Sequence, residues 1–143
     1  MRKQNLIALT SRISEQAHRS LIQELEKRGV KGIVPSHGGI MALLFTGNLY
    51  TMKEIAEKIH RTKPTVTVLV EKLVQLGYVK KMRNEEDSRS TLLELTKEGK
   101  KLEPVFEAVS RTVNAIVYQG LSEDEAVLAE CLLAKIRKNF EEN

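Results

Sequence analysis

Apolar residues in the first part of the chain recur at spacings of three and four. Between Asn5 and Arg28 they form a single stripe, which predicts a long amphipathic helix. Its members are Leu6, Leu9, Ile13, Ala17, Leu21 and Leu25. Gly29 and Gly32 follow the last of them and are expected to end the helix. Such a stripe packs either on its own domain or against a second copy of the chain.

Two short helices are predicted in the middle of the chain, after a helix over Pro35–Phe45. The segment Thr51-Met-Lys-Glu54 has the form of a capping box, so it opens a helix from Thr51 to His60. After a tight turn a second helix runs from Lys63 to Leu76, and Gly77 stands where a left-handed cap is wanted. Two short helices joined in this way form a helix-turn-helix unit.

The second of these helices has two distinct faces at about 100° per residue. Its apolar face holds Val66, Leu69, Val70, Leu73 and Leu76. Its other face holds Pro64, Thr67, Val68, Glu71 and Gln75, with Lys63 and Lys72 on the flanks. An exposed valine is ordinary on any protein surface. Beside threonines and lysines, Val68 also suits contact with a thymine methyl in a major groove.

A β-hairpin is predicted next, with strands at Tyr78–Met82 and Thr91–Leu95. The turn between the strands is rich in charged residues. These residues form either a solvated charge cluster or the tip of a hairpin in which an acid orients an arginine. The tip residues are Arg83, Asp87 and Arg89. Thr96 then caps a helix predicted from Lys97 towards Tyr118. A capping box at Ser122 opens a last helix, expected to bury Leu128, Leu132, Cys131 or Leu133, Ile136 and Phe140.

Composition narrows the class of protein. The 143 residues are 41% hydrophobic and 29% charged, which is ordinary for one globular domain. Residues 48–101 hold 12 basic and 8 acidic residues, whereas the rest of the chain holds 11 of each, so the whole basic excess lies in the helix-turn-helix and hairpin region. A localised basic excess is typical of a protein that binds a polyanion. The single cysteine, Cys131, lies in an apolar pattern that favours burial.

Several functions are disfavoured by the same inspection. No apolar run approaches the roughly 20 residues that span a bilayer, and the N-terminal apolar stretch is too short for a secretion signal. We therefore expect a cytoplasmic protein with no membrane partner. Neither a nucleophile with its base nor a phosphate-binding loop is visible, so we expect no enzyme, no catalytic residue and no cofactor. The three histidines are scattered, which disfavours a metal site.

The order of these elements, a helix-turn-helix followed directly by a two-stranded hairpin, is that of a winged helix. The segment from Asp87 to Gly99 fits the pattern D-x-R-x-x-x-[VL]-x-L-T-x-x-G at every fixed position. In this segment, and in Thr67–Leu73 with Leu76–Val79, the chain resembles the MarR-type (multiple antibiotic resistance regulator) transcription factors. The expected fold is mainly α with a small β-hairpin: a winged helix-turn-helix flanked by N- and C-terminal dimerisation helices.

The resemblance implies one MarR-like domain over residues 1–143. Residues 5–30 and 100–143 would form the dimerisation helices of a homodimer, and residues 35–99 the winged-helix lobe that binds a pseudo-palindromic DNA operator. The DNA-binding residues it implies are Ser36, Thr51, Lys63, Pro64, Thr65, Thr67, Val68, Lys72, Arg83, Asp87 and Arg89. Many members have arginine where this chain has Val68, so an apolar contact and an AT-rich site are expected instead. Plain helix capping is the alternative role for Ser36 and Thr51.

A regulatory ligand is a further implication of the resemblance. Family members commonly bind a small aromatic or lipophilic effector between the dimerisation helices and the lobe, and the candidate residues here are Arg12, His18, His37 and Met41. The resemblance favours a repressor that such a ligand releases from DNA. The competing interpretation is a winged-helix module for protein interaction or dimerisation without specific DNA binding. The pairing of Asp87 with Arg89 separates the two, because an interaction module does not need it.

Overall fold

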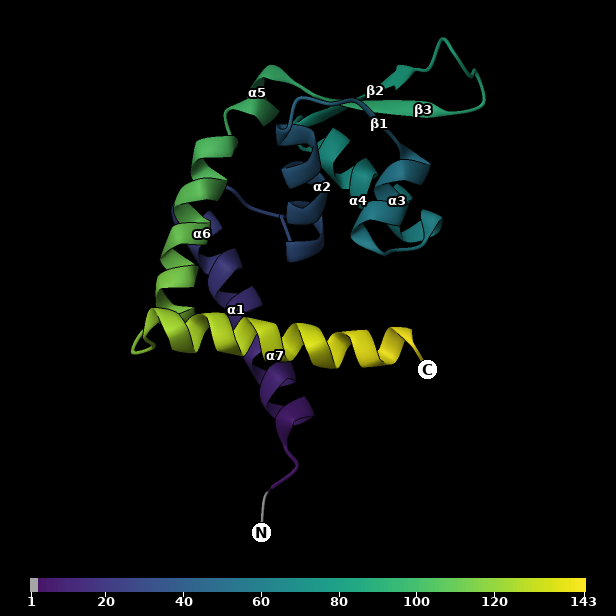
Figure 1. Cartoon of the computed structure of the whole chain (residues 1–143). Coiled ribbons are helices and arrows are strands. Elements are labelled where there is room, and N and C mark those ends of the chain that lie inside the picture. Colours follow the sequence, from purple (N-terminus) through teal and green to yellow (C-terminus); the bar gives the residue numbers. More distant parts are fainter. Residues whose placement is uncertain (1–2) are drawn as a thin grey trace.

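A computed structural model describes residues 3–143 and shows two parts (Figure 1). A lobe of three helices and a small sheet lies at one end, and three long helices extend from it. The elements are α1 (Leu6–Lys27), α2 (Pro35–Phe45), β1 (Tyr50–Thr51), α3 (Met52–Ile59), α4 (Lys63–Gln75), β2 (Val79–Arg83), β3 (Thr91–Leu95), α5 (Lys97–Lys100), α6 (Glu103–Val117) and α7 (Glu123–Glu141). None of the helices in residues 3–143 is both long and apolar enough to cross a membrane.

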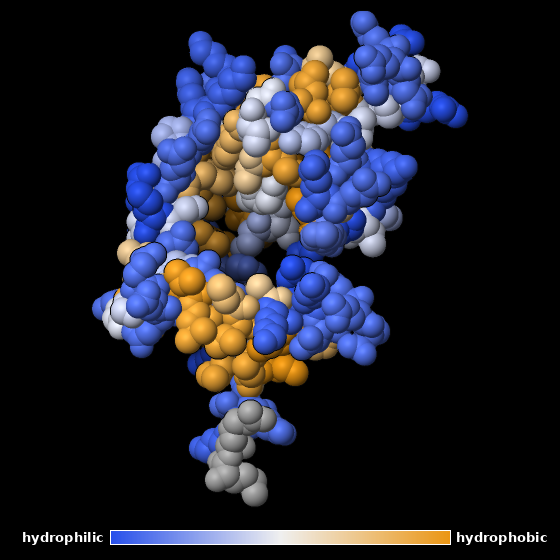
Figure 2. All heavy atoms as spheres, in the orientation of Figure 1, coloured by the Kyte–Doolittle hydropathy of each residue, from blue (hydrophilic) through white to orange (hydrophobic). Residues whose placement is uncertain are grey.

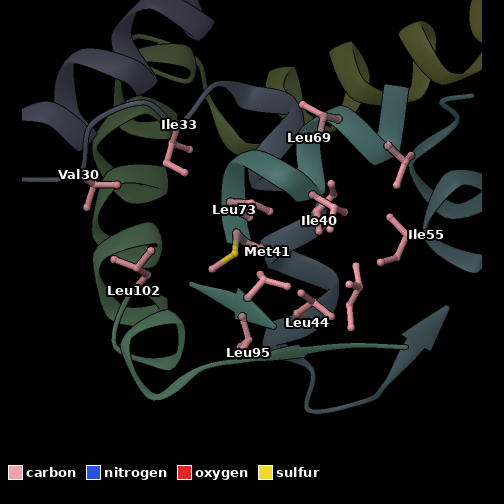
Figure 3. Close-up of a cluster of buried hydrophobic side chains, with 14 of the residues drawn as sticks. Val30, Ile33, Ile40, Met41, Leu44, Ile55, Leu69, Leu73, Leu95 and Leu102 are labelled. Carbon is pink, nitrogen blue, oxygen red and sulfur yellow. The ribbon is translucent and has the colours of Figure 1, made fainter. Parts of the chain in front are cut away.

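The core lies between α2, α3, α4 and the sheet. Ile40, Ile55, Leu73 and Leu93, one residue from each of these elements, are fully buried, and Figure 3 shows the side chains of the core converging there. The predicted apolar face of α4 is confirmed, since all of its members are buried except Leu76, which is half-buried. Because this face is packed against the core, the opposite face of α4 points into solvent.

The helix boundaries of the lobe follow local signals. Thr51 Oγ1 accepts a hydrogen bond from Glu54 N at 3.1 Å, and Glu54 Oε1 accepts one from Thr51 N at 2.9 Å, which confirms the capping box. At the end of α4, Gly77 has a φ of +86° and Tyr78 N donates to Leu73 O at 3.0 Å. This closure uses Tyr78, so the strand begins one residue later than predicted, at Val79.

The sheet has three antiparallel strands in the order β1-β3-β2. The hairpin is confirmed, with Val79 opposite Leu95 and Arg83 opposite Thr91. The two-residue strand β1 was not predicted. It pairs Tyr50 with Leu93, and a strand so short has no periodicity that a sequence pattern can reveal.

The helix predicted from Lys97 towards Tyr118 is in fact two helices, which corrects the sequence interpretation. α5 ends at Lys100, Leu102 N donates to Gly99 O at 3.1 Å, and α6 begins at Glu103. The cause is Pro104, which has no N–H to offer the carbonyl of Lys100 and cannot sit inside a continuous helix.

The prediction that α7 buries its apolar residues is wrong for a single chain. Against residues 3–143, α7 buries none of its side chains, and Phe140 is 73% exposed. Cys131 is likewise exposed rather than buried. The stripe of α1 is divided, because Leu25 is buried while Leu6, Leu9 and Ile13 are exposed. Helical periodicity marks an apolar face correctly, but it does not say which chain covers that face.

Candidate nucleic-acid interface

The turn between α3 and α4 is set by a left-handed residue and a hydroxyl cap. His60 has a φ of 56°, and Arg61 N donates back to Ala56 O at 3.0 Å, which closes α3 tightly. Thr62 then caps α4, with its Oγ1 accepting from Thr65 N at 3.4 Å. These contacts fix the direction in which α4 leaves the turn.

The outward face of α4 carries the predicted contact residues. Val68 is 70% exposed at its centre. The other exposed members are Lys63, Pro64, Thr65, Thr67, Glu71, Lys72 and Gln75. The Thr67 hydroxyl donates to Lys63 O at 3.0 Å, so an oxygen lone pair remains on it for an incoming donor. A valine, threonines and lysines on one exposed helix present both apolar and polar groups to a ligand.

Lys72 lies on one flank of α4 rather than beside Val68. Its Cε lies 3.2 Å from the position that a Cβ on Gly32 would occupy, so the side chain crosses the α1–α2 connection. The pKa of His37 lies below its ordinary value of 6.5, mainly because the imidazole is buried and secondly because the Lys72 ammonium is nearby. The lysine is therefore placed beside the lobe's core instead of in the middle of the outward face.

The tip of the hairpin holds an arginine braced by an acid. Asp87 Oδ1 accepts from Arg89 N at 3.0 Å and from Arg89 Nε at 3.3 Å. The side chain of Arg89 is nevertheless 91% exposed. Asn84 Nδ2 donates to Ser90 Oγ at 2.8 Å and closes the loop behind it. The predicted pairing is thus present, and it orients a guanidinium that no other contact holds in the described chain.

The second half of the Asp87–Gly99 pattern, which includes Thr96 and Gly99, has a structural role. Thr96 Oγ1 donates to Gly77 O at 2.5 Å and accepts from Gly99 N at 3.0 Å, joining β3, α4 and α5. A Cβ on Gly99 would lie only 2.0 Å from Tyr78 O. The β2–β3 hairpin is the wing of the winged helix. The threonine and the glycine therefore fix the base of the wing, whereas Asp87 and Arg89 form its tip.

One contact across the interface was missed by the sequence interpretation. Lys81 Nζ of β2 forms an ion pair with Glu71 Oε1 of α4. Arg83, at the end of β2, is exposed as predicted. The pair links the outward face of the helix to the wing, and only the packing of α4 against β2 reveals it.

Ser36 and Thr51 lie at the starts of two helices. The Thr51 hydroxyl is used as a cap, and the Thr51 N–H lowers the pKa of the Glu54 carboxyl. Ser36 lines a hollow of about 190 Å³ together with His18 and Arg61. The cap of α2 is instead formed by His37, whose Nδ1 accepts from Val34 N at 2.9 Å.

The four predicted effector residues are not gathered at one place. Met41 is fully buried in the core, and His37 is buried at the start of α2. Arg12 is exposed on α1, and His18 lines the hollow described above. A separate cavity of about 550 Å³ lies between α1, α2 and α6, and none of the four is among its described lining residues. It is lined by Leu21, Ile22, Leu25, Ile33, Val34, Pro35, Gly38, Ala42, Phe45, Glu103, Phe106, Glu107, Val109, Ser110 and Arg111.

A helix-turn-helix continued by a hairpin with an exposed, braced arginine defines a winged-helix protein. The model of the MarR family matches residues 36–91 of the chain, from the start of α2 to the end of the wing loop. The matched region contains the whole outward face of α4 and the tip of the wing.

Individual proteins are similar to the chain as well. The chain is 34% identical over 62 residues to the HTH-type transcriptional regulator SarZ of Staphylococcus haemolyticus, covering 43% of this chain and 42% of SarZ. It is 29% identical to the HTH-type transcriptional repressor MdtR of Bacillus subtilis, covering 85% and 76% of the two chains. The chain spans between 42% and 59% of the length of the first three curated relatives it matches.

The fold is shared with solved structures. The S. aureus MepR–DNA complex matches with a TM-score of 0.86 at 24% identity, over 96% of this chain and 99% of that one. The likeness extends through α1, α6 and α7, beyond the region that the family model matches. The expected fold class is thereby confirmed.

Proposed function

We propose that the protein is a sequence-specific, double-stranded DNA-binding regulator of transcription. The observation that carries this proposal is Arg89 at the wing tip, braced by Asp87 and almost wholly exposed. Packing does not explain the bracing, because the arginine supports no core residue, whereas a guanidinium held in one orientation loses less side-chain entropy on binding. The relatives are named transcriptional regulators, which favours a binding function over an enzymatic one.

In this proposal α4 enters the major groove and the wing enters the neighbouring minor groove. The methyl groups of Val68 would contact a thymine methyl, and the hydroxyls of Thr65 and Thr67 would accept or donate hydrogen bonds at base edges or phosphates. Arg89 would enter a narrow, electronegative minor groove. Lys63 would contact a phosphate, which fixes the register without reading sequence. Lys72 would contact one only after its side chain leaves the α1–α2 connection.

A homodimer is part of the proposal. Hydrophobic residues gather over α7 and the adjoining part of α1, whereas the wing is hydrophilic (Figure 2). The exposed apolar residues of this surface include Leu6, Ile7, Leu9, Ile13, Ile116, Val127, Leu128, Leu132, Leu133 and Phe140. Covering them with the same surface of a second copy would set two lobes on pseudo-palindromic half-sites. Residues 5–30 and 100–143 would then be the dimerisation segments, and 35–99 the DNA-binding lobe.

Release from DNA by a small aromatic or lipophilic molecule completes the proposal, as expected of a repressor. The cavity between α1, α2 and α6 supports it, because about 550 Å³ lies in the usual range for ligand sites. Its wall is mainly apolar, and it borders both the extended helices and the lobe. An occupant would shift α2 relative to α6 and so change the separation of the two lobes.

The test is selection of bound fragments from a random duplex pool, followed by titration of the best fragment at two salt concentrations. We expect a pseudo-palindrome with half-sites about one helical turn apart, and an affinity that falls steeply with salt. Absence of any enriched sequence, with weak binding throughout, would instead favour a winged-helix module for protein partners.

A further inference from the structure

An acidic residue lies in the middle of the helix face proposed to meet DNA. Glu71 follows Val68 by three positions, one turn along α4, and both are exposed on the side opposite the buried Val70 and Leu73. In the proposed complex, a carboxylate there would face the phosphates of a groove wall. Left unpaired, it would weaken the association of every DNA sequence with this face.

Lys81 reaches this carboxylate because of the pleat of the wing. Lys81 pairs with Leu93 across the hairpin, and Leu93 is fully buried on the face of the sheet that covers the core. Lys80 points to the other face, where its Nζ lies 3.5 Å from Glu94 Oε2. Two adjacent lysines thus have different directions and different partners, and the backbone register sets both.

The ion pair itself contributes little to folding. The side chain of Lys81 is 41% exposed and that of Glu71 is 55% exposed, so solvent screens their attraction. Its position matters more than its strength, because it joins the centre of the α4 face to the strand that supports the wing.

We propose that Lys81 is a positioning residue for DNA binding that acts through Glu71: it neutralises the Glu71 carboxylate, so that the outward face of α4 presents no unpaired negative charge to the phosphates of DNA. This inference rests on the proposed DNA-binding function. In the bound complex, the Lys81 ammonium would remain paired with the Glu71 carboxylate and would not bind a phosphate, although a basic residue on a wing would ordinarily be counted among the phosphate contacts.

A double-mutant cycle tests the assignment. Lys81→Met leaves Glu71 unpaired, and we expect the affinity for the best selected fragment to fall about tenfold. Glu71→Gln alone should leave the affinity unchanged or slightly higher. The double variant, Lys81→Met with Glu71→Gln, should recover to within about threefold of the wild type, because the harmful charge has gone with its partner.

Lys80→Met is the matched control, since it removes the same charge from the neighbouring position of the same strand. Lys80→Met should lower the affinity for the selected fragment by at most about threefold. Lys81→Arg should retain the wild-type affinity because it keeps the ion pair with Glu71. Thermal unfolding should be similar for all variants, as expected of an exposed pair.

The outcomes separate this inference from the function on which it rests. A double variant as weak as Lys81→Met would mean that Lys81 binds phosphate directly, and would overturn the positioning role. Equal losses for Lys80→Met and Lys81→Met would overturn it as well, since net charge would then account for both. Wild-type protein that binds no fragment would overturn the proposed function itself.

Discussion

Replacing Arg89 by alanine removes the exposed guanidinium that Asp87 braces at the wing tip. The side chain makes its only described contacts with Asp87, and an exposed pair of this kind contributes at most about 1 kcal/mol to folding. The variant should therefore unfold at nearly the temperature of the wild type. We expect the substitution to change the affinity for DNA and not the stability of the fold.

The expected loss of affinity follows from the number of wings. A direct contact of a guanidinium with DNA contributes about 1–3 kcal/mol. At the lower value, two wings in a dimer lose about 2 kcal/mol together, which is about thirtyfold in the dissociation constant. A dimer that inserted only one wing would lose about fivefold at that value, so the size of the effect also reports how many wings engage.

Fluorescence anisotropy with the best selected duplex would measure this loss, with sedimentation confirming that the variant remains a dimer. Asp87→Asn is the companion variant, because it weakens the bracing without removing the guanidinium, and we expect a smaller loss, of about threefold to fivefold. Arg89→Lys keeps the charge and tests whether the planar guanidinium matters. An Arg89→Ala dimer with unchanged affinity would refute the reasoning and remove the wing from the proposed mechanism.

Further predictions concern the helix face, the base of the wing, the start of α2 and the proposed dimer surface. Val68→Ala should relax the preference at one or two base positions of a selected site by about 1 kcal/mol, and an unaltered sequence profile would show that Val68 does not face the groove. Gly99→Ala places a methyl group against Tyr78 O and should destabilise the fold by about 1–3 kcal/mol in chemical unfolding, whereas an unchanged midpoint would contradict that packing. His37 has a lowered pKa when folded, so the unfolded chain binds its proton first as the pH falls below 6.5, and this contribution to stability decreases from there down to the folded pKa. His37→Gln keeps an acceptor for the backbone N–H and should flatten this part of the pH profile of the unfolding free energy; an identical slope would assign the pH dependence to other groups. Leu132→Glu should shift sedimentation towards monomer and lower DNA affinity while leaving the chain folded, and a stable dimer would place the interface elsewhere.

Much of the proposed interface could be predicted from the sequence, because the signals involved act over a few residues. The capping box at Thr51, the left-handed Gly77 and the alternation of Thr91–Leu95 each describe a local conformation. The pairing of Asp87 with Arg89 is also local, since the two lie two residues apart in one loop. The sequence therefore sufficed for the helix-turn-helix, the hairpin and its braced tip.

The positions that were misjudged depend on segments far apart in the chain. Met41 was a ligand candidate, yet the lobe packs around it and leaves none of it exposed. The apolar face of α7 was expected to be buried, yet nothing in residues 3–143 covers it. Residue type and spacing show that a side chain prefers burial, but not which segment or which chain will bury it.

The sequence by itself determined the type and order of the elements, because hydrogen bonds within a turn of helix and the alternation of a strand are encoded by near neighbours. Tertiary structure alone decided that Lys72 turns towards the lobe and that Lys81 meets Glu71. It also decided that a cavity opens between α1, α2 and α6. The physical reason is the same in each case: a side chain's surroundings are set by the packing of whole elements, which brings together residues that no local pattern relates.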